Sequence, residues 1–128
     1  MKIKLPKIFD SRGSLTYIEE HNHIPFKINK VHWIFDGKSG HNREGHALKH
    51  TSEFFILVSG SVEILTHDGK DENSFKLNTP NEGVLIKNGV WRTVTNFSSN
   101  SVCIILSSNV FNPDEYIRDF NEFIKISK

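Results

Sequence analysis

Residues 40–60 read GHNREGHALKHTSEFFILVSG, and the spacing of this stretch decides the fold. The spacing is G-x5-H-x-L-x4-E-x6-G, formed by Gly40, His46, Leu48, Glu53 and Gly60. Residues two apart in a strand share a face, so His46 and Leu48 point the same way. After Glu53, the run to Val58 is apolar, which predicts a strand buried on both faces. Glu53 begins this strand and is expected on the same interior as His46.

This spacing resembles the first motif of the cupin superfamily, in which two histidines and a glutamate hold a metal inside a small β-barrel. Leu48 stands at the second histidine position. The second cupin motif, P-x-G-x2-H-x3-N, fits residues 87–96 in frame, with Gly89 and Asn96 kept and Arg92 at the histidine position. The resemblance implies an all-β, cupin-type double-stranded β-helix, or jelly-roll barrel.

The two replaced positions argue against a metal. Arginine is a permanent cation and cannot act as an imidazole ligand. Zinc and iron sites normally keep at least three protein ligands, and here two of four are replaced. The residues therefore predict no cofactor and no metal.

Length and composition set further bounds. At 128 residues the chain fits one domain, predicted as a barrel over 1–110 and a helix over 112–125. The formal net charge of +1 gives no electrostatic footprint for nucleic acid or a membrane surface. Residues 1–9 lack the apolar core of a signal peptide, so we expect a cytoplasmic protein. The single cysteine, Cys103, lies in an apolar run and is expected to be a buried thiol.

Short segments of strand-forming residues recur at regular spacing, which is typical of a sandwich or barrel. They lie at 14–19, 31–36, 46–50, 53–58, 61–66, 73–77, 83–86, 90–97 and 101–107. Asp68-Gly69 between two of them predicts a hairpin.

The C-terminal segment has a helical pattern instead. Asn112 is a predicted N-cap, followed by Pro113 and by Glu115 three residues after the cap. Apolar residues then recur at i, i+4, i+7 and i+8, namely Tyr116, Phe120, Phe123 and Ile124. This helix is expected to lie on the barrel or on a partner subunit.

Arg92 and His46 each have two interpretations. An inward arginine presents a rigid fork of donors for phosphate or an oxyanion, but it can equally pair with Glu53. His46 is either a pocket histidine or a core histidine with its hydrogen bonds satisfied. The motif around His46 favours the pocket.

Seven further segments, spread in order over nearly the whole chain, carry a second resemblance. They are 10–15 (DSRGSL), 24–26 (IPF), 30–34 (KVHWI), 59–62 (SGSV), 68–69 (DG), 90–92 (VWR) and 114–120 (DEYIRDF). Together they resemble the nucleotide-linked sugar 3,4-ketoisomerases of the cupin superfamily. The terminal D-E-Y-I-R-D segment makes the ordered set specific.

This resemblance implies a reaction and an assembly. The expected substrate is dTDP-4-keto-6-deoxyglucose, isomerised to a 3-keto sugar that a 3-aminotransferase uses for surface glycans such as O-antigen lipopolysaccharide. The family needs no metal and forms homodimers in which N-terminal strands are exchanged. A histidine near neutral pKa suits removal of a proton from C3, beside the C4 ketone.

The resemblance also assigns residues. His46 matches the first histidine of the family segment R-G-x-H-A-H-K, and Arg43 matches its arginine. Leu48 replaces the second histidine and cannot transfer protons. His32, where relatives often carry tyrosine, is the candidate for the second acid/base group, and His50 is a weaker one. Residues expected to bind substrate are Arg43, Arg92, Glu53, Tyr17, Trp33 and Trp91.

Alternatives remain at this stage. His46 alone could take the C3 proton and return it to C4 on the same face. A non-catalytic cupin that binds a nucleotide sugar is a second reading of Leu48. A nucleotide-sugar epimerase, which also abstracts a proton beside a ketone, is a third.

Overall fold

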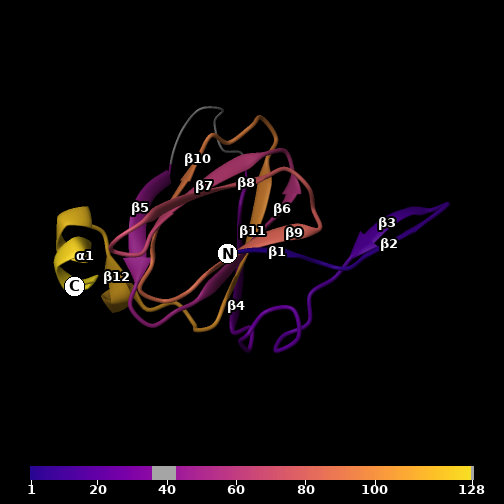
Figure 1. The fold of residues 1–128 in the computed structure, drawn as a ribbon. Coiled ribbons are helices and arrows are strands. Elements are labelled where there is room, and N and C mark those ends of the chain that lie inside the picture. The colour runs from indigo at the N-terminus through magenta and orange to yellow at the C-terminus, as the bar shows by residue number, and fades with distance from the viewer. Residues whose placement is uncertain (36–42, 128) are drawn as a thin grey trace.

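Short strands are the main regular element of the computed structural model (Figure 1). The structure describes residues 1–35 and 43–127, with residues 43 and 44 described for their backbone alone. The strands are β1 (Lys2–Lys4), β2 (Lys7–Asp10), β3 (Gly13–Thr16), β4 (Lys30–Ile34), β5 (Arg43–Leu48), β6 (Glu53–Ser59), β7 (Val62–His67), β8 (Glu72–Leu77), β9 (Glu82–Ile86), β10 (Trp91–Thr95), β11 (Val102–Ser107) and β12 (Tyr116–Ile117). A 3₁₀ turn, η1 (Pro113–Glu115), and a helix, α1 (Phe120–Ser127), lie near the C-terminus. Gly40 of the opening motif lies outside the described residues.

Two five-stranded antiparallel sheets form the barrel. Their strand orders are β1-β9-β6-β11-β4 and β12-β5-β10-β7-β8. Apart from the consecutive strands β7 and β8, neighbours within each sheet come from distant parts of the sequence, as in a jelly roll. The predicted all-β cupin fold is confirmed. No helix in the described part of the chain is long and apolar enough to cross a membrane.

Apolar side chains fill the space between the two sheets. The core is made of Phe55, Leu57, Val62, Ile64, Leu77, Val84, Ile86, Val94, Phe97, Cys103 and Ile105. Both sheets contribute to it because alternate residues of each strand face inward. Cys103 is buried as predicted, and this burial raises the pKa of its thiol to about 12.

β6 is buried on both faces at its start, as its apolar run predicts. Phe55 and Leu57 face the interior, while Phe54 lies in a second cluster on the outer face of the same sheet. That outer cluster contains Leu5, Ile24, Phe26, Phe54, Leu85 and Leu106, supplied partly by the segment before β4. The start of β6 is therefore enclosed on both faces, which makes it a rigid support for Glu53.

The hairpin predicted at Asp68-Gly69 joins β7 and β8. These strands pair from Val62 with Leu77 to His67 with Glu72. Gly69 has φ of 104°, a region that suits glycine, and Asp68 Oδ1 accepts from the backbone N–H groups of Lys70 and Asp71, both at 2.8 Å. The prediction is confirmed.

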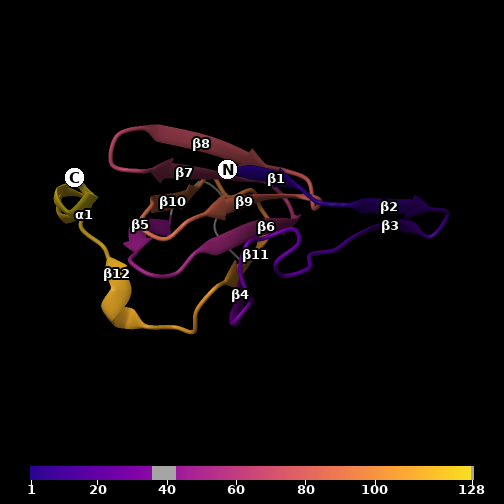
Figure 2. The same cartoon turned by 60° about the horizontal axis from the view of Figure 1, so that its bottom comes forward.

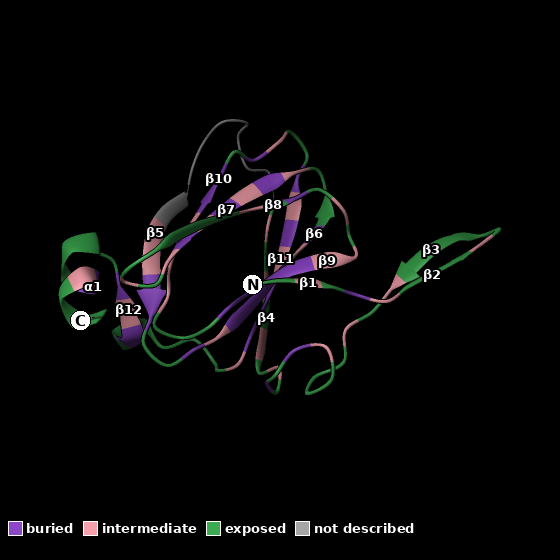
Figure 3. Cartoon of the chain, viewed as in Figure 1, coloured by how far each residue is buried: buried purple, intermediate pink, exposed green. Residues whose placement is uncertain are grey.

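β2 and β3 form a separate two-stranded hairpin. It projects away from the barrel (Figures 1 and 2), and its strands pair with each other from Lys7–Thr16 to Asp10–Gly13. Its side chains are mostly exposed (Figure 3), including the large apolar ones of Ile8, Phe9 and Leu15. An isolated hairpin is marginally stable in water, so this arm calls for a partner surface.

The predicted helix over 112–125 is wrong in its boundaries. Asn112 does cap, accepting from the N–H of Asp114 at 3.0 Å, but it caps η1. Tyr116 and Ile117 are then extended and pair with Leu48 and Ala47 of β5, so α1 begins only at Phe120. Long-range pairing with a sheet edge overrides the local helical pattern here. Phe123 and Ile124 pack against Ala47, Ile117 and Trp91, which confirms that the helix lies on the barrel.

Candidate active site

Two strand pairings put His46, Arg92 and Tyr116 on one face of the second sheet. β10 pairs with β5 so that Arg92 lies opposite His46, and β12 pairs with β5 so that Tyr116 lies opposite Leu48. Directly opposed residues share a face, as do residues two apart in a strand. Arg92 and Leu48 are buried, while His46 and Tyr116 are half-buried. This face is the barrel interior, so the expectation that His46 and Leu48 both point inward is confirmed.

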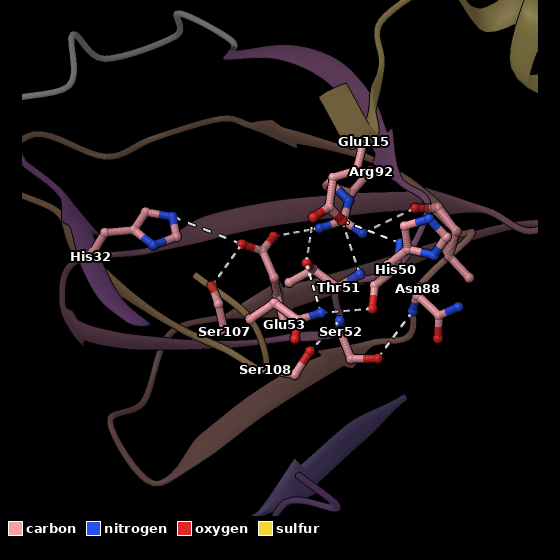
Figure 4. Close-up of polar contacts among 12 residues, drawn as sticks. His32, His50, Thr51, Ser52, Glu53, Asn88, Arg92, Ser107, Ser108 and Glu115 are labelled. Atoms are coloured by element: carbon pink, nitrogen blue, oxygen red, sulfur yellow. Dashed lines mark hydrogen bonds and ion pairs between the residues drawn. The ribbon is translucent and has the colours of Figure 1, made fainter. Parts of the chain in front are cut away.

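The first sheet contributes Glu53, Ser107 and His32 from the opposite wall. Glu53 lies opposite Ser107 in the pairing of β6 with β11, and Ser107 Oγ donates to Glu53 Oε2 at 3.1 Å. His32 Nε2 lies 3.9 Å from the same oxygen, and Figure 4 shows the two side chains pointing toward each other. The His32 side chain is 40% exposed, so a buried carboxylate lies behind an imidazole that solvent and ligands can reach.

An ion pair joins the two walls. Arg92 Nη1 donates to Glu53 Oε1 (Figure 4). Arg92 Nη2 donates to the carbonyl oxygen of Val90 at 3.1 Å. The arginine is 1% exposed, and this burial lowers the pKa of its guanidinium, while the nearby Glu53 charge opposes that shift. Of the two roles that the sequence allowed for Arg92, the structure shows the ion pair with Glu53. The pair fixes the carboxylate that faces His32.

A second buried carboxylate braces the segment that carries Tyr116. Glu115 Oε1 accepts from the backbone N–H groups of His50 at 3.2 Å and Thr51 at 3.0 Å. Its Oε2 accepts from Thr51 Oγ1 at 2.8 Å. Glu115 is buried, and sequence analysis assigned it only to a helix cap. In the structure it ties η1 to the loop after β5 and so places β12.

Tyr116 is a residue of this site that sequence analysis missed. Its ring centroid lies 5.1 Å from that of the His46 ring, tilted by 35°, and the Arg118 guanidinium lies 4.6 Å from the same Tyr116 centroid. Burial, followed by the charge of Glu53, raises the pKa of the Tyr116 phenol. The D-E-Y-I-R-D segment was the available signal, but its apolar spacing had placed Tyr116 on a helix face.

Three predicted site residues, Trp33, Trp91 and Tyr17, lie away from the His46 cluster in the structure. Trp33 is on the outer face of β4 and is 56% exposed. Trp91 packs outside the barrel against Phe120 and Phe123, at ring distances of 5.2 and 5.7 Å. Tyr17 follows the projecting hairpin and lines a cavity of about 330 Å³ with Ile18, Ile28, Ile56 and Leu106 among others. The structure therefore does not bring these three rings to the His46 cluster within one chain.

The two remaining candidates, His50 and Arg43, lie at opposite ends of β5. β5 ends at Leu48, so His50 lies beyond the strand, and it is exposed. Arg43 begins β5, but its side chain lies outside the described residues. Within the described part of the chain, no three His, Cys, Asp or Glu side chains gather as a metal site requires.

Fold and site together define a cupin barrel whose interior carries two histidines, a tyrosine and a buried carboxylate–guanidinium pair. Comparison with known proteins narrows this class. The family model described as FdtA: WxcM-like, C-terminal, matches residues 1–128. The chain belongs to this family.

Three individual proteins to which the chain is similar are 3,4-ketoisomerases or 3,4-oxoisomerases by name. The chain is 37% identical over 123 residues to the TDP-4-oxo-6-deoxy-alpha-D-glucose-3,4-oxoisomerase of Aneurinibacillus thermoaerophilus, covering 96% of this chain and 88% of that protein. It is 36% identical to a 3,4-ketoisomerase of Helicobacter canadensis, with a TM-score of 0.95 and coverage of 99% and 96%. It is 31% identical to a QdtA 3,4-ketoisomerase variant of Thermoanaerobacterium thermosaccharolyticum in complex with TDP-4-keto-6-deoxyglucose, with a TM-score of 0.94 and coverage of 99% and 92%.

The ion pair makes a stability prediction. Arg92→Met leaves the Glu53 carboxylate buried without its cation, so we expect the free energy of unfolding to fall by about 3–5 kcal/mol. Adding Glu53→Gln removes the uncompensated charge and should restore part of the loss. Urea denaturation followed by circular dichroism measures both. A loss below about 1 kcal/mol for Arg92→Met would mean that the pair behaves like an exposed one.

Proposed function

We propose that this chain is a sugar 3,4-ketoisomerase that converts dTDP-4-keto-6-deoxy-D-glucose into a dTDP-3-keto-6-deoxyhexose. The observation that carries the proposal is the place of His46 on the interior face of β5, opposite Arg92 and across the barrel from the His32–Glu53 pair. His46, the proposed base, therefore faces the titratable ring of His32 across the interior of the barrel. Family membership and the names of the relatives support the same reaction.

The chemistry begins at C3. His46 takes the C3 proton, the C3–H electron pair forms a C3=C4 double bond, and the C4 carbonyl electrons move to O4. This gives an enediolate, and a neutral imidazole is a suitable base for it near pH 7. The product forms when O3 loses its proton to become the new ketone and C4 gains a proton.

His32 is our proposed donor to C4. Its ring lies on the wall opposite His46, and its Nε2 lies 3.9 Å from Glu53 Oε2, which orients the ring toward the interior. Because His46 and His32 lie on opposite walls, the C4 proton arrives on the face opposite to the one that lost the C3 proton. Both rings exchange protons with water before the next turnover.

Proton NMR of dTDP-4-keto-6-deoxyglucose with the protein in D₂O tests the function directly. We expect loss of the C3 proton signal and appearance of a 3-keto sugar deuterated at C4. The same reaction in H₂O leaves a proton at C4, and its coupling to H5 gives the C4 configuration. Exchange at C3 without a 3-keto product would favour an epimerase. Binding without any exchange would favour a sugar-nucleotide-binding protein in which Leu48 marks lost catalysis.

The role of His46 predicts the effect of His46→Asn. Loss of a general base costs typically 10²–10⁴-fold in rate, so isomerisation should fall within that range while nucleotide binding and folding persist. His21→Asn is the matched control, since His21 is exposed and its φ of 63° suits asparagine. Near-normal turnover of His46→Asn would contradict the assignment.

His32→Asn separates the two-base scheme from the one-base alternative. We expect C3 exchange to continue in D₂O, because His46 is intact, while formation of the 3-keto sugar falls by about 10²-fold or more. The same NMR assay gives both rates. An unchanged rate of product formation would remove His32 from the mechanism and leave His46 to serve both carbons.

We also propose that the chain is a homodimer in which the β2–β3 hairpin lies on a second copy. The hairpin exposes Phe9 (76%) and Leu15 (56%). The outer face of β4 exposes Val31 and Trp33, and Phe35, directly after the strand, is exposed as well. Exposed apolar side chains on a projecting arm and on a sheet face of the same molecule suit burial against each other between two copies. Tyr17, at the base of the arm, and Trp33 would then gain a partner surface.

The dimer predicts a concentration-independent mass of two chains in light scattering after gel filtration. The double substitution Phe9→Ser and Leu15→Ser removes apolar area from the arm and should shift the protein toward monomer. Lys7→Ser, an exposed polar change on the same arm, is the control. A monomeric wild-type protein at all concentrations would refute the proposal.

The product of the proposed reaction indicates which reaction follows it in biosynthesis. A 3-keto group on a nucleotide-linked sugar is the substrate that a 3-aminotransferase requires. We therefore propose that the chain serves amino-sugar synthesis in the cytoplasm, for surface glycans such as O-antigen lipopolysaccharide.

A further inference from the structure

Tyr116 holds a position that the proposed reaction leaves unassigned. β12 lies along the outer edge of β5 (Figure 1), and its register puts Tyr116 opposite Leu48, two residues from His46 on the same face. The two rings are 5.1 Å apart. Leu48, directly opposite Tyr116, is buried and carries no proton to transfer. The phenol is thus the titratable group that β12 adds beside the proposed base.

The surroundings of the phenol keep it protonated. Burial and the negative charge of Glu53 raise its pKa, while the positive charges of Arg118 and Arg92 act in the opposite direction and are outweighed. Its ring is also held in place, with Arg118 at 4.6 Å and Phe111 at 5.8 Å. A fixed, protonated hydroxyl beside a base is suited to donating a proton and receiving one back.

The reaction needs such a group. In the reaction C3 loses a proton and C4 gains one. The oxygens change as well, because O3 begins as a hydroxyl and becomes a ketone while O4 begins as a ketone and becomes a hydroxyl. His46 and His32 serve the carbons in the proposed scheme. O3 is bonded to C3, and O4 is bonded to the adjacent C4. A group packed beside the base that acts at C3 is therefore close to both oxygens of a bound substrate.

We propose that the Tyr116 phenol carries the proton between the two substrate oxygens. It gives its proton to O4 of the enediolate and becomes a phenolate. The phenolate takes the O3–H proton, the O3–H electron pair forms the C3=O3 bond, and the C3=C4 pair takes a proton at C4. Tyr116 is neutral again, and no other reactant is consumed. This inference rests on the proposed ketoisomerase function.

Tyr116→Phe tests it, because phenylalanine keeps the ring against His46 and removes the hydroxyl alone. Exchange at C3 needs no change of protonation on oxygen, whereas product formation does. We expect the rate of 3-keto formation to fall about 10²–10⁴-fold, with C3 exchange in D₂O reduced no more than about tenfold. The ratio of product formation to exchange therefore falls at least tenfold.

Controls separate this role from packing. Phe111→Leu disturbs a neighbour of the same ring without removing a titratable group, so it should leave the ratio unchanged. If Tyr116→Phe lowered exchange and product together, Tyr116 would only position His46, and the proposal would be overturned. An unchanged rate would overturn it too. A wild-type protein that makes no 3-keto sugar would overturn the proposed function, and this role with it, in the same experiment.

Discussion

The ion pair between Arg92 and Glu53 joins the two sheets at the polar end of the barrel. Removing both charges from water is costly, and such a pair persists only when further hydrogen bonds satisfy the remaining atoms. Here the carbonyl of Val90 accepts from Arg92 Nη2 and the hydroxyl of Ser107 donates to Glu53 Oε2, at 3.1 Å each, while Arg92 Nε is buried without a hydrogen-bond partner among the described residues. The carboxylate is thereby held in one orientation, facing His32. The other site residues are arranged around this fixed charge.

The interior of the barrel is divided along its length. Apolar residues such as Phe55, Ile64 and Val94 fill one part and hold the sheets together by burial. The polar residues occupy the part where β4, β5 and β12 approach the edges of their sheets. Buried polar groups lower stability unless they are fully paired, so the apolar part allows the polar part to be kept for chemistry.

The sequence was sufficient to predict the fold and the inward orientation of His46, because the motif combines the two-residue period of a strand with turn residues that act locally. Glu53 and Arg92 were also predicted to face the interior, although their pairing was left open, since it depends on two strands far apart in the chain. Tyr116 was missed because the local helical pattern of residues 112–124 conflicts with a two-residue pairing to β5. Trp33 and Trp91 were placed by residue type, and only the sheet register reveals that they face outward.

β12 has two residues and lies at the edge of its sheet, so it is held by few backbone bonds and by the buried Glu115 carboxylate. Segments of this kind open at a free energy well below that of global unfolding. Each such opening would carry Tyr116 away from His46 while the barrel stays folded. The competent state of the site is therefore one population of a local equilibrium, and any ligand that contacts Tyr116 shifts that equilibrium toward the closed segment by mass action.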